Sequence, residues 1–330
     1  MRIVSLLPSA TEIVYALGLE DQLVGVTHEC DWPPAARTLP VVSHSALPAT
    51  TDPVEIDRVV AASLGDGEPI YRLDREAIRD LRPDVVLSQD LCAVCAVPSG
   101  HVNAALEVLG CRAEVVSLDP GSLDEVLGCV LRVGEVTGTA SRAEAVVADL
   151  RRRLADVRAT VAGRPRPRVF ALEWGDPPFN GGHWIPDMID TAGGEPVLAN
   201  RGAPSERVRW SDIAAAEPDV VVFMPCGYDL DAAVEEGRRT LVARPELAGA
   251  TIFAVPANAH FSRPGPRLVD GVEILAAALH PGASASSPGD AAVRRSTCGA
   301  SASSPGDAVL RLSSRARPPS PRRAAGPRHG

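Results

Sequence analysis

The stretch Ser141–Gly163, SRAEAVVADLRRRLADVRATVAG, decides the fold of this chain because it contains no proline and no glycine before its last residue. Ser141-x-x-Glu144 has the form of a capping box, which predicts that a helix begins there, and Gly163 predicts its end. At about 1.5 Å per residue, a helix over residues 141–161 spans roughly 31 Å, about the width of a small domain. Such a helix between two folded halves acts as a strut that permits small closing motions.

Short units of strand and helix lie on both sides of this strut. Ser9-x-x-Glu12 predicts a first helix that Gly18 ends. The other elements expected before the strut are strands at residues 3–6, 24–27, 85–88 and 115–118 and helices at 53–64, 75–81 and 102–109. After the strut we expect a strand at 220–222, a helix at 229–242, a strand at 251–255 and a helix at 267–279.

The two halves share one building plan. The sequence RPDVVL at residues 82–87 returns as EPDVVV at residues 217–222, each time after a short helix-like segment. Strands that alternate with helices predict mainly parallel sheets covered on both faces. The expected fold is therefore α/β, with two Rossmann-like lobes of mainly parallel sheet joined by a single long helix.

Composition divides the chain further. From Gly282 onward Pro, Ser, Ala, Gly and Arg dominate, and the string GASASSPGDA occurs twice. So few large apolar residues do not offset the entropy of ordering a chain, which predicts a disordered tail. We expect an N-terminal lobe at 1–138, a linking helix at 139–163, a C-terminal lobe at 164–281 and a disordered low-complexity tail at 282–330.

Charge and missing residue types exclude several functions. The tail carries eight Arg and two Asp, a charge of +6, so the total of −9 leaves residues 1–281 at −15. An acidic body argues against nucleic-acid binding. The chain has no Lys, which excludes a Walker-type phosphate loop and Schiff-base chemistry.

The N-terminus predicts neither export nor membrane insertion. The apolar run in MRIVSLLPSATE is only five residues long before Pro8 and is followed by Glu12. Seven Cys without an export signal are typical of reduced thiols. On the sequence as given we expect a cytoplasmic location, or a periplasmic or cell-surface one if an upstream signal precedes this start.

Five ordered motifs carry a resemblance to a known family. They are LLPSATEIVYALG near the start, THECDWPP at 27–34, SQDLCAVCAV at 88–97, DPPFNGGHW at 176–184 and FSRPGPRLVDGVEIL at 261–275. Together with the strut, they resemble the cobalamin and iron-siderophore class of ABC-importer substrate-binding proteins, most of all the cobalamin-binding members. The resemblance covers residues 1–281. It implies two lobes, a ligand held between them without catalysis, and no catalytic cofactor.

The candidate ligand-binding residues follow predicted strands, because ligands of parallel sheets lie beyond the carboxyl ends of the strands. From the first half they are Pro8, Ser9, His28, Trp32, Gln89 and Asp90. From the second half they are Trp174, Phe179, Asn180, His183, Trp184, Asn258, His260, Phe261, Ser262 and Arg263. Aromatic rings supply faces on which a planar corrin rests. Gln89, Asn180, Asn258 and Ser262 supply hydrogen bonds for its amide rim.

Two alternatives stay open. One is a ferric siderophore or heme-type chelate, although only Arg263 and Arg267 offer positive charge near the last loop. The other, from a different class, is a metal- or thiol-dependent enzyme that uses His28, His183, His260 and the pair Cys92 and Cys95. One Cys pair is half of the usual zinc set, so packed reduced thiols are the simpler interpretation.

The resemblance also implies a partner. Family members dock on an ABC permease through one acidic residue on each lobe. Glu76 lies at the matching place in the first half. In the second half Ser211 takes that place and Asp212 follows it, and Ser211 is expected to cap a helix. The expected assembly is a monomer that binds a small corrinoid or metal chelate, with a permease as possible partner.

Overall fold

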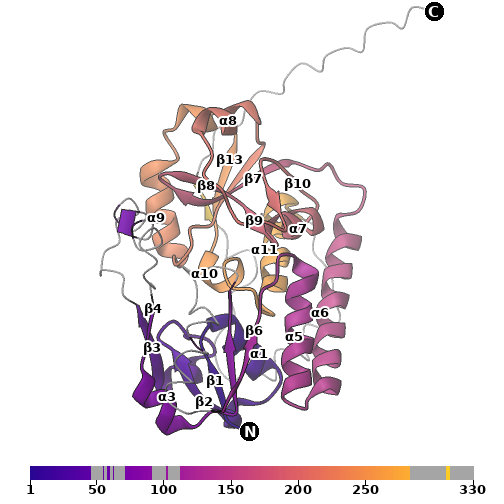
Figure 1. Cartoon of the computed structure of the whole chain (residues 1–330). Coiled ribbons are helices and arrows are strands. Elements are labelled where there is room, and N and C mark those ends of the chain that lie inside the picture. Colours follow the sequence, from indigo (N-terminus) through magenta and orange to yellow (C-terminus); the bar gives the residue numbers. More distant parts are fainter. Residues whose placement is uncertain are drawn as a thin grey trace, which may run out of the picture.

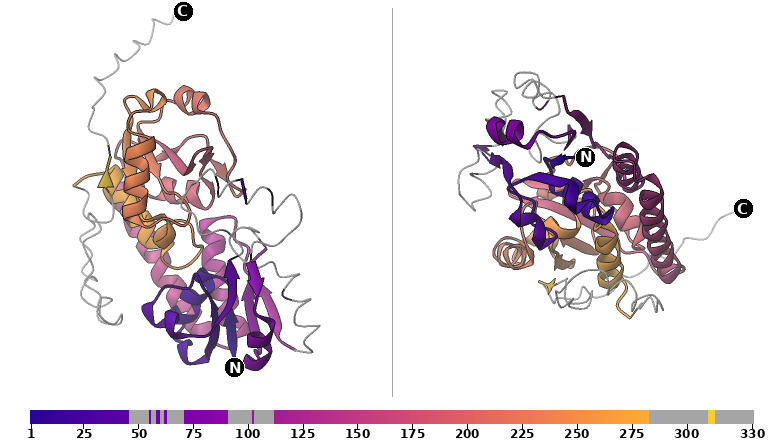
Figure 2. Two further views of the ribbon diagram at one scale, coloured as in Figure 1. Left: turned by 90° about the vertical axis from the view of Figure 1, so that its left-hand side faces the viewer. Right: turned by 90° about the horizontal axis from the view of Figure 1, so that it is seen from below.

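The computed structural model describes residues 1–45, 71–90, 112–282 and 310–312, together with positions 55, 58, 59, 62 and 102. In this part of the chain, two α/β lobes lie one above the other, and a long helix runs along one side of the molecule (Figure 1 and Figure 2). The predicted fold class is confirmed. The predicted helices at 53–64 and 102–109 fall largely outside the described residues.

The N-terminal lobe is built on one six-stranded sheet in the order β4-β3-β2-β1-β5-β6. Its strands are β1 (Ile3–Ser5), β2 (Leu23–Thr27), β3 (Val41–Ser45), β4 (Tyr71–Leu73), β5 (Val85–Ser88) and β6 (Glu114–Ser117). Only β4 runs antiparallel to its neighbour. Because β1, β2 and β5 are parallel and central, their carboxyl ends share one edge, which faces the second lobe.

The C-terminal lobe repeats the plan with the sheet order β10-β7-β12-β13-β14. Its strands are β7 (Arg168–Gly175), β10 (Glu195–Pro196), β12 (Val220–Phe223), β13 (Thr251–Ala254) and β14 (Leu310–Arg311), and β8 (Pro178–Asn180) pairs with β7. A small separate sheet joins β9 (Gly182–His183) to β11 (Asn200–Arg201). Central β12 is parallel to both neighbours, as the RPDVVL and EPDVVV echo predicts.

Eight helices of at least six residues belong to the described part of the chain. They are α1 (Pro8–Ala16), α3 (Arg75–Leu81), α5 (Leu123–Val136), α6 (Ala140–Val161), α7 (Ile185–Thr191), α8 (Trp210–Ala215), α9 (Leu230–Thr240) and α11 (Leu268–Leu279). The short α10 (Ala257–His260) lies in the loop before α11. Helices α5 and α7 are absent from the predicted elements.

Three predicted helix starts are wrong. α6 begins at Ala140, so Ser141 lies inside the helix, and α1 begins at Pro8, so Ser9 also lies inside. Ser211 lies inside α8, which begins at Trp210. Pro8 at the first helical position supplies the start signal of α1 without a side-chain cap. A serine cap of this kind occurs at α5 instead, where Ser122 Oγ accepts from Glu125 N at 3.3 Å.

One core cluster runs through both lobes along α6. The buried face of α6 consists of Ala143, Val147, Leu150, Leu154, Val157 and Val161. These side chains belong to a cluster that also holds Ile3 of β1 and Met188 of α7. Two smaller clusters cover the other faces of the two sheets. Because its buried face belongs to the core shared by both lobes, α6 is a packed strut and not a free tether.

The predicted disordered tail needs a correction at residues 310–312. β14 pairs antiparallel with β13, and Leu312 N donates to Ile252 O at 2.8 Å. Leu312 packs against the cluster around Phe223. A Cβ placed on Gly237 would lie 2.5 Å from Leu312 Cδ1, so the glycine leaves the space that this leucine fills.

Within the described residues, no helix is long and apolar enough to cross a membrane.

The shared core predicts a stability effect. Replacing Leu150, which is buried in α6, with Ala removes packing from the joint core, and we expect unfolding free energy to fall by about 2 to 5 kcal/mol in urea titrations. Arg152→Ala is the control, because Arg152 lies on the same helix but is exposed. Equal stability of the two variants would contradict the assignment of this face to the core.

Candidate functional site

A cavity of about 120 Å³ lies at the carboxyl ends of the strands, between the lobes. Gln89, which follows β5, lines it from the N-terminal lobe. The C-terminal lobe supplies the other lining residues: Glu173, Gly182, His183, Trp184, Ile185, Ser205, Met224, Cys226, Phe261, Ser262 and Pro264. Five predicted site residues, Gln89, His183, Trp184, Phe261 and Ser262, therefore come together from segments far apart in the sequence.

Trp184 and His183 form the aromatic wall of the cavity. Their rings stack with centroids 5.4 Å apart, and Trp184 Nε1 donates to Phe261 O at 2.8 Å, which fixes the indole. His183 has a φ of +47°, in the left-handed region. Among the described residues its buried Nε2 has no hydrogen-bond partner. Burial lowers the pKa of His183, which favours the neutral imidazole.

Glu173 and Ser205 also line the cavity, and neither is among the residues predicted from the sequence. Glu173 Oε1 accepts from Gly182 N at 3.1 Å, and its Oε2 accepts from the Ser205 hydroxyl. The carboxylate thus connects β9 to the loop after β11. The sequence could have indicated Glu173 only through its position near the end of a strand. This indication was missed because β7 is not among the predicted strands.

Trp174 lies at the end of β7 in a second aromatic group. Its ring meets Tyr228 edge to face with centroids 5.9 Å apart, and Asn258 N donates to Tyr228 O at 3.3 Å. Trp174 Nε1 is buried without a hydrogen-bond partner among the described residues. Trp174 and Asn258 are therefore held together through Tyr228, although neither lines the 120 Å³ cavity.

Asn180 and Phe179 contact other residues of the protein and do not line the cavity. Asn180 Nδ2 donates to Leu198 O and its Oδ1 accepts from Glu206 N, both at 2.7 Å. Its amide is thus used by the backbone of the neighbouring loop and is not free for a ligand. The Arg207 guanidinium lies over the Phe179 ring at 5.7 Å from the centroid.

Four more predicted residues take part in a contact between the lobes: Pro8, Ser9, Trp32 and Arg263. Pro8 and Ser9 at the start of α1 are buried, and a Cβ on Gly265 of the other lobe would lie 3.5 Å from Ser9 Cα. Arg263 forms an ion pair with Asp31 and donates to Glu29 O at 3.1 Å. The Arg267 guanidinium lies 4.6 Å from the centroid of the Trp32 ring.

Beneath this contact lies Glu12. Arg267 Nη1 is 3.4 Å from Glu12 Oε1, and Arg263 Nη1 is 4.0 Å from the same oxygen. Glu12 Oε2 is buried without a hydrogen-bond partner among the described residues. Burial raises the pKa of Glu12 to about 7, although the two guanidinium groups oppose the shift. We call Glu12, Asp31, Trp32, Arg263 and Arg267 the inter-lobe latch.

The other predicted ligand residues lie apart from the cavity. His28 Nδ1 contacts Ser43 O at 3.1 Å, and its ring lies 5.9 Å from Tyr71. Asp90 N donates to Asp119 Oδ1 at 2.5 Å. Burial and the nearby Arg267 charge lower the pKa of His260 to about 4, and its Nδ1 lies 3.9 Å from Asp270.

The histidines therefore occupy separate surroundings. Among the described residues, no three His, Cys, Asp or Glu side chains gather closely enough to hold a metal ion. Cys92 and Cys95 lie outside the described residues.

The two candidate docking carboxylates differ in their surroundings. Glu76 is exposed in the first turn of α3. Asp212 accepts from Arg209 Nε at 2.9 Å and from Arg209 Nη2 at 2.8 Å, and this hydrogen bonding lowers its pKa. Asp212 thus stays ionised in an ion pair with Arg209, whereas Glu76 is exposed to solvent.

Comparisons with known proteins agree on the kind of molecule. A family model described as periplasmic binding protein matches residues 3–252. The vitamin B12-binding protein of Vibrio cholerae is 26% identical over 281 residues, which cover 82% of this chain and 86% of that protein. The cobalamin-binding protein of Halobacterium salinarum is 29% identical over 287 residues, which cover 84% of this chain and 69% of that protein.

A solved structure with the same architecture has a different named ligand. The crystal structure of a periplasmic heme-binding protein from Pseudomonas aeruginosa is 26% identical and superposes with a TM-score of 0.62. The match covers 86% of this chain and 94% of that one. The relatives therefore agree on binding within this fold but differ in the macrocycle that they bind.

The buried Glu12 predicts a pH dependence of stability. Its folded pKa lies above the ordinary value of 4.5, so the folded state favours the neutral form, and the resulting stabilisation is lost as pH rises from 4.5 through 7. Glu12→Gln keeps the group neutral. Relative to wild type, the variant is expected to gain on the order of 3 kcal/mol between pH 4.5 and 8 in urea unfolding. Glu76→Gln, at an exposed position, serves as control, and a pH-independent difference for Glu12→Gln would contradict the burial argument.

Proposed function

This chain belongs to the periplasmic binding protein family, and we propose that its inter-lobe cleft binds a corrinoid of the cobalamin type. The observation that carries the proposal is the chemistry of the cavity lining. It offers the aromatic faces of Trp184 and Phe261 and the polar groups of Gln89, Ser205 and Ser262. Among the described lining residues there is no Arg. This combination suits a ligand with a large apolar plane and neutral amide side chains.

The arginines near the cleft favour a corrinoid over heme. Heme carries two propionates, and a ferric siderophore is usually anionic, so either ligand needs free cations. Arg263 pairs with Asp31, and Arg267 pairs with Glu12 while covering Trp32. In the closed form these pairs compensate both guanidinium charges, so an anionic ligand has to compete with Asp31 and Glu12 for them. A neutral rim of amides makes no such demand.

Ligand entry requires the lobes to part. A cavity of about 120 Å³ is well below the roughly 300 to 1,000 Å³ that ligand sites of drug size occupy. We infer that the lobes rock about α6 and that the pair of Arg263 with Asp31 breaks as they do. The same motion uncovers the Trp32 ring from Arg267, and it brings Trp174 and Asn258 within the widened cleft.

Delivery to an ABC permease is part of the same proposal, since the resemblance implies such a partner. Glu76 is its first candidate contact because Asp212 is already paired with Arg209. The family to which this chain belongs is described as periplasmic binding proteins. We propose that this chain carries its bound ligand to such a permease.

Calorimetric titration tests the ligand. Cyanocobalamin is expected to bind with one-to-one stoichiometry and micromolar or tighter affinity, while hemin binds at least tenfold more weakly because its propionates find no free cation. His183→Ala removes a wall of the cavity and is expected to weaken cyanocobalamin binding about tenfold, a loss of ~1.4 kcal/mol. His44→Ala, at an exposed position of β3, is the control. Tight hemin binding without cyanocobalamin binding would assign the chain to the heme alternative.

Stopped-flow kinetics test the latch. Arg263→Ala removes its ion pair with Asp31, so the lobes part more readily, and the association rate of cyanocobalamin is expected to rise several-fold. Arg209→Ala removes a similar but exposed ion pair with Asp212 and is expected to leave the rate unchanged. An unchanged rate in Arg263→Ala would show that the contact does not limit entry.

A further inference from the structure

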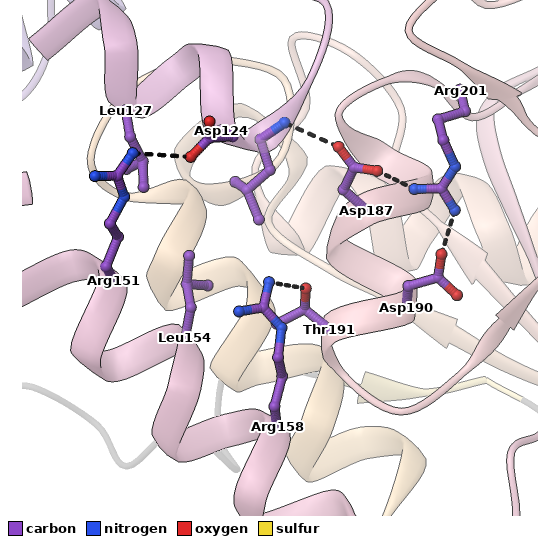
Figure 3. A pocket seen from close by; sticks show the side chains of 10 residues that line it. Asp124, Leu127, Arg151, Leu154, Arg158, Asp187, Asp190, Thr191 and Arg201 are labelled. Carbon is purple, nitrogen blue, oxygen red and sulfur yellow. Dashed lines mark hydrogen bonds and ion pairs between the residues drawn. The ribbon is translucent and has the colours of Figure 1, made fainter.

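A second and larger cavity lies away from the inter-lobe cleft. Its volume is about 510 Å³, within the range of small-molecule sites. It forms a wedge among α5, α6 and α7, as Figure 3 shows. None of its lining residues lines the cavity at Trp184 or takes part in the latch.

The floor of this wedge is apolar. Leu123 and Leu127 of α5 and Leu154 of α6 face it, and all three side chains are at least 95% buried. Such a floor favours an aliphatic or aromatic body over bulk water.

The rim of the wedge is charged, and its three arginines differ in whether a carboxylate pairs with them. Arg201 forms ion pairs with Asp187 and Asp190. Arg151 Nη2 is 3.0 Å from Asp124 in an exposed pair. Arg158 lies two helical turns beyond Arg151 on α6, and within the described residues its guanidinium hydrogen-bonds to the Thr191 hydroxyl alone, at 3.3 Å (Figure 3). Among the described residues no carboxylate lies within 4.0 Å of its guanidinium.

We propose that this wedge binds a small organic anion, with its carboxylate or phosphate head on Arg158 and its apolar body on the leucine floor. A guanidinium without a carboxylate partner keeps donors free for a two-pronged contact with such a head. Arg151 lies two helical turns away on the rim of the same wedge, and it adds a second cation there because its exposed ion pair with Asp124 is worth little and is readily exchanged.

The position of the wedge suggests what an occupant does. Leu123 N at the start of α5 donates to Asp187 Oδ2 of α7 at 3.0 Å, so the N-terminal side of the molecule meets the second lobe at the edge of this cavity. A molecule that contacts α5, α6 and α7 together biases the angle between the lobes. Its binding is then coupled to ligand binding in the cleft, and the coupling is reciprocal. The coupling rests on the proposed function, but the binding itself does not.

Calorimetry of the full chain with octanoate tests the site. Octanoate carries both a carboxylate and an apolar chain, so it is expected to bind more tightly than inorganic phosphate or octanol, each of which lacks one of the two parts. Arg158→Ala is expected to weaken octanoate binding about tenfold, the loss expected for one charge-assisted hydrogen-bonded contact. Arg152→Ala is the matched control, because Arg152 lies on the same helix but pairs with Asp149 and Asp156 and does not line the wedge.

The outcomes separate the site from the proposed function. Octanoate binding that depends on Arg158 supports the site even if cyanocobalamin does not bind. Absent octanoate binding, or binding that Arg158→Ala leaves intact while its circular dichroism stays native, overturns the site. Phosphate binding as tight as that of octanoate overturns the role of the leucine floor. Arg151→Ala gives a second variant, with a smaller expected loss, should Arg158→Ala fail to fold.

Discussion

A buried carboxylate between two lobes constrains this molecule more than any other single feature. Glu12 lies inside the contact between α1 and the loop before α11, and Arg267 and Arg263 of the opposite lobe face one of its oxygens. A carboxyl group in that place is tolerated only as a neutral group or as a partner of those guanidiniums. The motifs SATE at residues 9–12 and RPGPR at 263–267 are therefore two halves of one structure, more than 250 residues apart.

The latch and the strut act together. α6 shares its buried face with the core of both lobes, so it resists bending and permits only rocking. The latch lies at the lobe contact over the cleft, and the wedge at Arg158 lies at the strut. We propose that the latch governs access to the cleft and that the wedge offers a place from which the lobe angle can be biased. In the closed form the latch pairs Arg263 and Arg267 with carboxylates, which an anionic macrocycle has to displace.

Local sequence signals predicted the skeleton of the fold but not the roles of single side chains. Apolar runs placed β1, β2, β5, β12 and β13, because buried parallel strands read as continuous apolar segments. Ser9 and Ser141 have the spacing of capping residues, yet the helices begin earlier, and Glu12 turns inward to meet another lobe. The strand at Leu310–Arg311 escaped prediction because its partner is β13, and because the space for Leu312 depends on a glycine in α9.

The candidate site was predictable to a similar degree. Five residues predicted from the rule that ligands lie beyond the carboxyl ends of parallel strands line one cavity, namely Gln89, His183, Trp184, Phe261 and Ser262. This rule does not indicate which polar groups already form hydrogen bonds or ion pairs within the protein. Asn180 is bonded to backbone on both sides of its amide, and Arg263 is held by Asp31, facts that only tertiary contacts decide.

The absorption spectrum of the protein isolated from cells grown with cobalamin tests the central claim most directly. If the cleft holds a corrinoid, the isolated protein is coloured and carries the visible bands of cobalamin in one-to-one ratio, or acquires them on dialysis against cobalamin. A protein that stays colourless after such dialysis, or that carries the Soret band of heme instead, would contradict the account.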